Sequence, residues 1–159
     1  MTLPKTLLGV GLVCLFLMGC SDYLDNKLQE EVRQTFKAPD NFKLSEQEVA
    51  NLKDMGITIN IHNEYPVLSV QAKFHTINKA QVPSGFLHTF GQELSTLACS
   101  LLDDLSQMDE RQRKAIATVI TEDKVSTKFV LQDKTGQVMI DEQIPLTQCP
   151  QFTQFQSAK

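Results

Sequence analysis

The sequence lacks the motifs on which most catalytic sites are built. It has no Gly-x-Ser-x-Gly, no His-Glu-x-x-His, no phosphate-binding loop and no calcium-binding loop. The three histidines, His62, His75 and His88, do not have the spacing of metal ligands. A histidine on the polar face of a strand, where His62 and His75 fall, is far more often solvated than ligating. We therefore expect no catalytic site, no cofactor and no metal.

Two acidic pairs and one basic patch do not change this expectation. Adjacent residues of a helix point in different directions, so we interpret Asp103-Asp104 and Asp109-Glu110 as a solvated helix face and a helix cap. The patch at 111–114, which holds Arg111, Arg113 and Lys114, is interpreted as a solvated surface. A phosphate or lipid-headgroup site is the alternative for that patch.

The sequence also lacks a hydrophobic run long enough to span a bilayer. The apolar run Leu7–Phe16 follows a single charge, Lys5, and a span needs roughly 20 apolar residues. The run ends in Leu17-Met18-Gly19-Cys20, which resembles a bacterial lipobox. That resemblance implies cleavage before Cys20, a thioether-linked diacylglycerol on its sulfur, and an acyl chain such as palmitate on the new amino terminus. A plain signal peptide or a transmembrane anchor fits less well.

Acyl chains on Cys20 would hold the protein at a membrane. They contribute about 0.8 kcal/mol of binding energy per buried CH2, and more than one chain makes the attachment stable. The residues after the predicted cleavage site indicate which membrane this is. By analogy with enterobacterial lipoprotein sorting, Ser21 favours export to the outer membrane, whereas an aspartate there would favour inner-membrane retention. We expect a lipid-anchored protein of the outer membrane that faces the periplasm. The inner membrane is the lesser alternative, because Asp22 lies one place later.

Positive charge is scarce. The chain carries 15 basic and 19 acidic side chains, and loss of Lys5 with residues 1–19 leaves a net charge of −5. Nucleic-acid binding needs clustered positive charge, so we expect no nucleic-acid partner. The mature chain has the length of one domain.

The four cysteines have different predicted fates. Cys14 leaves with the signal and Cys20 carries the lipid, so Cys99 and Cys149 remain in an oxidising compartment. Two cysteines allow one connectivity, and a loop of this length contributes roughly 4 kcal/mol on the chain-entropy model. The alternative, a redox or metal pair, lacks a Cys-x-x-Cys spacing.

Residues 22–37 are predicted to form an amphipathic helix. Apolar residues recur at every fourth position, namely Leu24, Leu28, Val32 and Phe36. The stripe is narrow and its flanks carry both signs of charge, so we favour packing on the domain, or a loosely docked tether, over a membrane-surface helix. A break at 38–41 follows. A second helix begins with the capping box Ser45-x-x-Glu48 and ends at Gly56.

Alternation with a period of two then predicts a hairpin from Ile57 to Phe74, with its turn at 63–66. Pairing His62 with Val67 places apolar residues together on one face. The predicted pairs are Ile61 with Leu68, Ile59 with Val70, and Ile57 with Ala72.

A central helix is predicted over 86–106, and it carries Cys99. The stretch 116–121 is ambiguous, because its β-branched residues favour a strand and its neighbours favour a helix. A second hairpin runs from Val125 to Ile144, and its turn has Gly136 placed for a positive φ. Pairing Gln132 with Gln137 sets Leu131 against Val138, Phe129 against Ile140, and Val125 against Ile144.

Several of these segments together resemble a known family. Glu64–Ala72 of the first hairpin, the helix with Cys99, Gly136–Ile144 of the second hairpin and the closing Cys149 are similar to the disulfide-bearing S-beta pilotins. These are small lipoproteins of bacterial type II secretion. The resemblance implies a sheet flanked by helices, a helix-to-C-terminus disulfide, and a role in binding the C-terminal segment of the secretin subunit and carrying it to the outer membrane. The family has a further strand between the first hairpin and the cysteine helix, which this sequence does not show.

The predicted fold is α+β: a mostly antiparallel sheet of two hairpins packed on a central helix, with one disulfide, preceded by a signal peptide. The predicted divisions are a signal at 1–19, a lipidated N-terminus and tether at 20–44, a globular domain at 45–150 and a tail at 151–159.

We expect a non-enzymatic, membrane-tethered binding lipoprotein, with a pilotin-like escort as its sharpest form. A partner peptide would lie in a helix-lined groove or extend a sheet edge. The alternative is a small envelope inhibitor of a cell-wall hydrolase, or an outer-membrane assembly factor. An enzyme would require a concave cluster of titratable groups.

Overall fold

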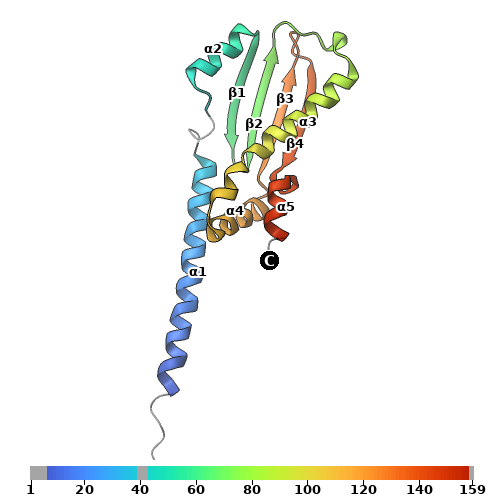
Figure 1. Ribbon diagram of the computed structural model, residues 1–159. Helices are drawn as coiled ribbons and strands as arrows, with labels where there is room; N and C mark the ends of the chain where they lie inside the picture. Colours follow the sequence, from blue (N-terminus) through green and yellow to red (C-terminus); the bar gives the residue numbers. More distant parts are fainter. Residues whose placement is uncertain (1–6, 39–42, 158–159) are drawn as a thin grey trace, which may run out of the picture.

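The computed structural model describes the backbone of residues 7–38 and 43–157, and the side chains of these ranges except 7–21, 104–105 and 155–157. Figure 1 shows a small domain with one long helix projecting from it. The helices are α1 (Leu7–Lys37), α2 (Glu46–Asp54), α3 (Ser84–Ser100), α4 (Glu110–Glu122) and α5 (Pro150–Ser157), and the strands are β1 (Ile57–Glu64), β2 (Val67–Phe74), β3 (Ser126–Gln132) and β4 (Val138–Pro145). Short 3-10 turns, η2 (Lys79–Gln81), η3 (Asp103–Gln107) and η4 (Leu146–Gln148), connect some of them.

The predicted α+β class is confirmed, and both hairpins form. The four strands lie in the order β1-β2-β3-β4. The outer pairs are antiparallel, but β2 and β3 are parallel, which was not predicted. The parallel pairing is possible because α3 and α4 lie between these strands in the chain and return it to the same end of the sheet. In the described part of the chain, no strand lies between β2 and α3.

The predicted register of the first hairpin is wrong by two residues. Glu64, rather than His62, lies opposite Val67, because Tyr65 and Pro66 alone separate the strands. The Tyr65-Pro66 peptide bond is cis. A shift of two leaves each side chain on its predicted face. The apolar pairs become Ile61 with Val70, Ile59 with Ala72, and Ile57 with Phe74.

The second hairpin also departs from the prediction. Leu131 lies opposite Ile140 rather than Val138, and an irregularity follows, after which Gln132 lies opposite Val138. The buried carboxylate of Asp133 explains the longer turn, since it accepts hydrogen bonds from the Thr135 hydroxyl and from the Thr135 and Gln137 amides. Phe129 therefore pairs with Glu142, and Thr127 pairs with Ile144. The predicted positive φ at Gly136 is confirmed, as it is at Gly56.

One predicted helix is shorter than expected, and one ambiguous stretch proves to be helical. The helix expected over 86–106 is α3, which ends at Ser100 before the 3-10 turn η3. The ambiguous stretch 116–121 is helical and belongs to α4. The side chain of Asp109 caps α4 by accepting from the Gln112 amide at 2.9 Å, while Gln112 reaches back to the Asp109 amide. This local capping box starts the helix, and tertiary burial of Val119 and Ile120 holds its β-branched residues in place.

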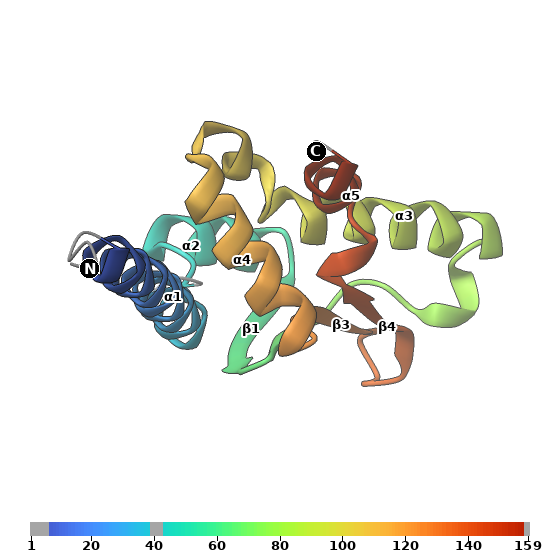
Figure 2. The ribbon, with the colours of Figure 1, turned by 90° about the horizontal axis from the view of Figure 1, so that it is seen from below.

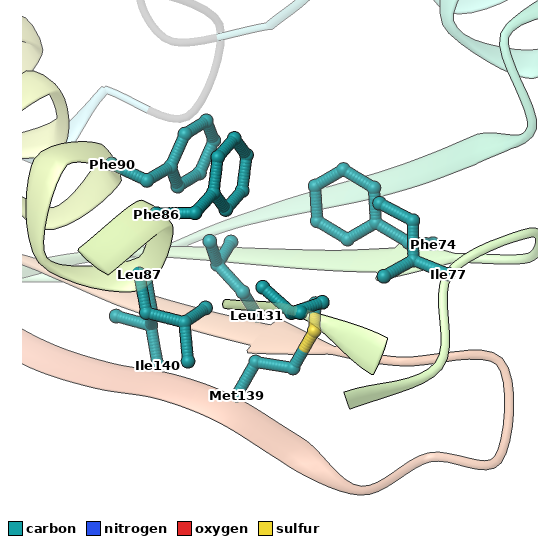
Figure 3. A pocket seen from close by; sticks show the side chains of 9 residues that line it. Phe74, Ile77, Phe86, Leu87, Phe90, Leu131, Met139 and Ile140 are labelled. Atoms are coloured by element: carbon teal, nitrogen blue, oxygen red, sulfur yellow. The ribbon is translucent and has the colours of Figure 1, made fainter. Parts of the chain in front are cut away.

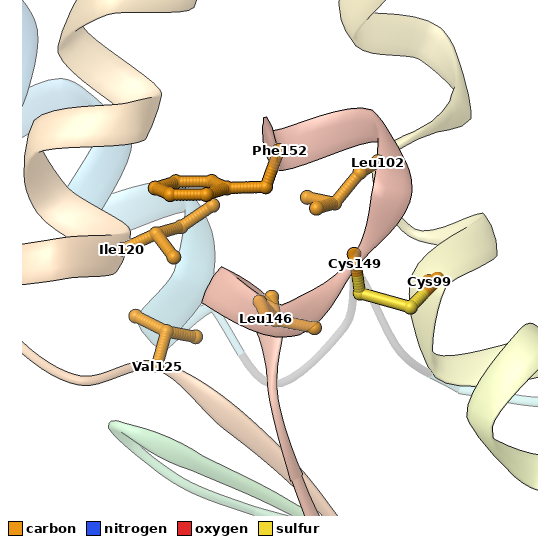
Figure 4. Close-up of a cluster of buried hydrophobic side chains, with 7 residues drawn as sticks. All are labelled: Cys99, Leu102, Ile120, Val125, Leu146, Cys149 and Phe152. Atoms are coloured by element: carbon orange, nitrogen blue, oxygen red, sulfur yellow. A yellow bond between two sulfur atoms is a disulfide. The ribbon is translucent and has the colours of Figure 1, made fainter. Parts of the chain in front are cut away.

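The core consists of two clusters. The first lies between the sheet and α3, and its buried members are Ala72, Leu94, Ala98, Phe129, Leu131 and Ile144. The second lies at the end of the sheet where α4 and α5 are found (Figure 4), and its buried members are Cys99, Leu102, Ile120, Val125, Leu146, Cys149 and Phe152. The predicted Cys99–Cys149 disulfide is confirmed. Residues 150–157, for which no element was predicted, form α5 and place Phe152 in the core.

Helix α1 packs beside α4, as Figures 1 and 2 both show. The predicted helix over 22–37 forms its second half, and Phe36 packs against the second core cluster. Of the signal predicted at 1–19, the structure describes only the backbone of residues 7–19, which belongs to α1, and the side chain of Cys20 lies outside the described residues. Within the described residues, no helix is both long and apolar enough to cross a membrane.

Candidate binding surface

An apolar pocket lies at the N-terminal end of α3 (Figure 3). The cavity is small, with a volume of about 40 Å³, and it opens to solvent. Its lining side chains are all apolar: Phe74, Ile77, Val82, Phe86, Leu87, Phe90, Leu131, Met139 and Ile140. We call it the α3 pocket. Pockets for drug-sized ligands begin at about 300 Å³, so this one is far smaller and suits at most one apolar side chain of a partner.

The pocket continues into an exposed apolar stripe along α3. Phe86, Phe90, Leu97 and Leu101 recur at spacings of four, seven and four residues, which places them on one face of a helix. The exposed fractions are 52% for Phe86, 58% for Leu97 and 42% for Leu101. The rings of Phe86 and Phe90 are stacked, with centroids 5.8 Å apart. We call these four residues the α3 stripe; Phe86, Leu97 and Leu101 are exposed and Phe90 is half-buried, and exposed apolar side chains grouped on one face are candidates for an interaction site.

No titratable side chain lines the α3 pocket. It therefore offers neither a proton donor nor an acceptor, and nothing in it would bind a cation. Its chemistry is limited to the burial of apolar groups, at about 25 cal/mol per Å² removed from water.

A separate polar cluster joins α1 to the domain. Arg33 donates through Nε to Asp123 Oδ2 and through Nη2 to Glu122 Oε2, both at 2.9 Å. The Tyr65 hydroxyl donates to the same oxygen of Asp123. The amine of Lys37 lies 5.2 Å from the centre of the Tyr65 ring. Arg33 is ion-paired with Glu122 and Asp123, and the Tyr65 hydroxyl is hydrogen-bonded, so the cluster attaches α1 to the domain.

The cluster shifts two pKa values in opposite directions. The hydrogen bond from Arg33, and then that from Tyr65, lower the pKa of Asp123. Burial raises the pKa of Tyr65 above its usual value, and its bond to Asp123 adds to this. Both pKa shifts favour an ionised Asp123 beside a neutral Tyr65.

The structure does not bring the three histidines together. His62 is exposed on β1, and His88 is exposed on α3. His75 follows β2, where its Nε2 lies 2.8 Å from the hydroxyl of Thr58. Among the described residues no group of three or more His, Cys, Asp or Glu side chains could hold a metal ion.

The acidic and basic residues discussed from the sequence have structural contacts. Asp109 is the N-cap of α4, as predicted, and Asp103 accepts from Gln151 Nε2 at 2.6 Å. The side chain of Asp104 lies outside the described residues. Arg111, from the basic patch, pairs with Asp25 of α1 at 2.6 Å. These contacts fit structural roles.

The comparisons with known proteins give no relative: no family model, no curated protein and no solved structure matches this chain. The α3 pocket and the α3 stripe are therefore identified as a candidate binding surface from their apolar lining and exposure alone.

Sequence reasoning missed the α3 pocket. Its lining comes from β2, the loop after it, α3, β3 and β4, and no sequence pattern assembles those five segments. One signal was present in the sequence. Phe86, Leu87 and Phe90 lie within the first two turns of a helix, and three large apolar side chains there exceed what packing against one face of a sheet would bury.

Proposed function

We propose that this protein is a lipid-anchored, non-enzymatic binding protein of the bacterial envelope. The observation that carries the proposal is the α3 stripe, which ends in a pocket lined by apolar side chains alone. Such a surface recognises the apolar side chains of another protein, for example one face of an amphipathic helix. The lipobox-like Leu17–Cys20 supports attachment to the outer membrane, facing the periplasm.

The sharpest form of the proposal is a pilotin-like escort. Its partner would be the C-terminal segment of a secretin subunit, whose apolar residues would cover the α3 stripe. The resemblance of both hairpins and of the cysteine pair to the S-beta pilotins supports this form.

A deletion strain tests the escort role. We expect loss of the protein to leave the secretin outside the outer-membrane fraction and to reduce its multimers. A complementing copy with Phe86→Ser and Leu97→Ser should fail to restore either, because both side chains lie on the exposed stripe. Gradient fractionation and immunoblotting of the secretin provide the measurement.

A matched control is Val49→Ser on α2, since Val49 is 49% exposed but lies off the stripe. This variant should restore the secretin fully. A secretin that reaches the outer membrane and multimerises normally without the protein would contradict the escort role. Inhibition of a cell-wall hydrolase by the purified protein would then favour the inhibitor instead.

A further inference from the structure

Helix α1 carries the predicted lipid site, Cys20, and reaches its contacts with α4 within one continuous helix. It runs unbroken through Cys20 to Lys37. The N-terminal half that projects past α4 and α5 in Figure 1 belongs mostly to the predicted signal, and cleavage before Cys20 leaves residues 20–37 of the helix. A rigid connection of this kind fixes the direction of the domain, whereas a flexible linker would leave the domain free to rotate.

The first attachment of α1 lies close to Cys20. Arg111, at the start of α4, pairs with Asp25 at 2.6 Å. Asp25 is five residues after Cys20, which is about 7.5 Å along a helix axis. The beginning of α4 therefore lies within about 10 Å of the level of the lipid site.

The second attachment lies farther along α1. Arg33 binds Glu122 and Asp123 at the end of α4, and Asn63 Nδ2 donates to the Phe36 carbonyl at 2.6 Å. Asp25 and Arg33 are eight residues apart, or about 12 Å along the axis. Two attachments at this separation hold α4 alongside α1 and prevent pivoting about either one.

The α3 pocket lies at the opposite end of the molecule. It is lined by the last residue of β2, Phe74, and by Met139 near the start of β4. In Figure 1 these strand ends are at the top of the sheet, away from α4 and α5.

The geometry points to α1 as a rigid post that holds the domain in one orientation on a lipid surface. The end with α4 and α5 faces the headgroups, and the α3 pocket faces away from them, toward a partner in the periplasm. This inference rests on the proposed lipidation of Cys20.

The sequence contains no tryptophan, so a single introduced tryptophan is the only source of tryptophan fluorescence. Its quenching by a probe in the membrane then reports how near that position of the domain lies to the lipid surface. One tryptophan is introduced at a time, as Glu110→Trp beside Arg111, or as Lys134→Trp in the turn between β3 and β4; both positions are exposed. Each full-length protein is produced in a bacterium, purified from its membranes and placed in phosphatidylcholine vesicles that carry a nitroxide on the headgroup. We expect the tryptophan at 110 to lose most of its fluorescence and the one at 134 to keep it.

A further pair of variants tests whether the orientation depends on the contacts between α1 and α4. Arg33→Met with Arg111→Met removes the ion pairs of both attachments, and in this background the tryptophan at 110 and the one at 134, each introduced singly, should be quenched to similar extents. Equal quenching at 110 and 134 in the protein with intact attachments would overturn the rigid post. The mass of each purified protein identifies its lipid. A protein without lipid would overturn the anchor and the orientation together, whereas equal quenching of a lipidated protein would overturn the orientation alone.

Discussion

At the scale of single residues, Asp123 has the most consequential contacts outside the core. It follows the last turn of α4 and accepts hydrogen bonds from Arg33 of α1 and from Tyr65 of the first turn. Three segments far apart in the chain therefore meet at one carboxylate. Its contribution to stability depends on its remaining ionised.

Replacing Asp123 by Asn should destabilise the protein by about 1–3 kcal/mol at pH 7, the usual effect of removing a partly buried hydrogen-bonded charge. Because folding lowers the pKa of Asp123, its stabilising effect is complete above the unfolded-state pKa of about 3.9. The effect is lost as the pH falls through the lower folded-state pKa. Urea unfolding of both proteins from pH 6 to pH 2 should show their difference shrinking toward zero. A difference that stays constant over this range would contradict the assignment.

At the scale of elements, sequence reasoning succeeded wherever local signals decide the structure. The capping box at Ser45 and Glu48 and the positive φ at Gly56 and Gly136 are properties of a few neighbouring residues, and all of them are confirmed. Strand registers were wrong because they depend on turns. The turn between β3 and β4 is set by the buried side chain of Asp133, which also accepts a hydrogen bond from the backbone amide of Lys79 in the loop after β2.

The disulfide is the element-scale feature that sequence reasoning predicted best. It joins the end of α3 to the residue before α5, across a sequence separation of 50 residues. Replacing both Cys99 and Cys149 by Ser should lower the free energy of unfolding by about 2–5 kcal/mol, because the unfolded chain regains the entropy of the open loop. Urea unfolding followed by circular dichroism provides the measurement. Wild-type protein treated with reductant should show a similar loss, and an unchanged midpoint in both would contradict a stabilising role.

At the scale of the whole molecule, the sequence was least informative. Alternating apolar residues are the same in parallel and antiparallel strands, so the parallel pairing of β2 with β3 could not be predicted from them. The α3 pocket exists only because that pairing brings β3 and β4 beneath the start of α3. The proposed function thus depends on an arrangement that no local pattern encodes.

That arrangement gives the molecule two different ends. The end with α4 and α5 carries the disulfide and the attachments of α1, and the other end carries the α3 pocket. An anchor at one end, the α3 pocket at the other and the α3 stripe running between them suit a protein that holds a partner along its length and away from the bilayer.

The most direct measurement is photocrosslinking in living cells. A photoreactive phenylalanine analogue is placed at Phe86 on the α3 stripe, and in a separate strain at Val49 on α2. The account predicts that mass spectrometry finds an adduct between position 86 and an apolar segment of the secretin C-terminus, with none at position 49. Equal adducts at both positions, or none with the secretin at position 86, would contradict it.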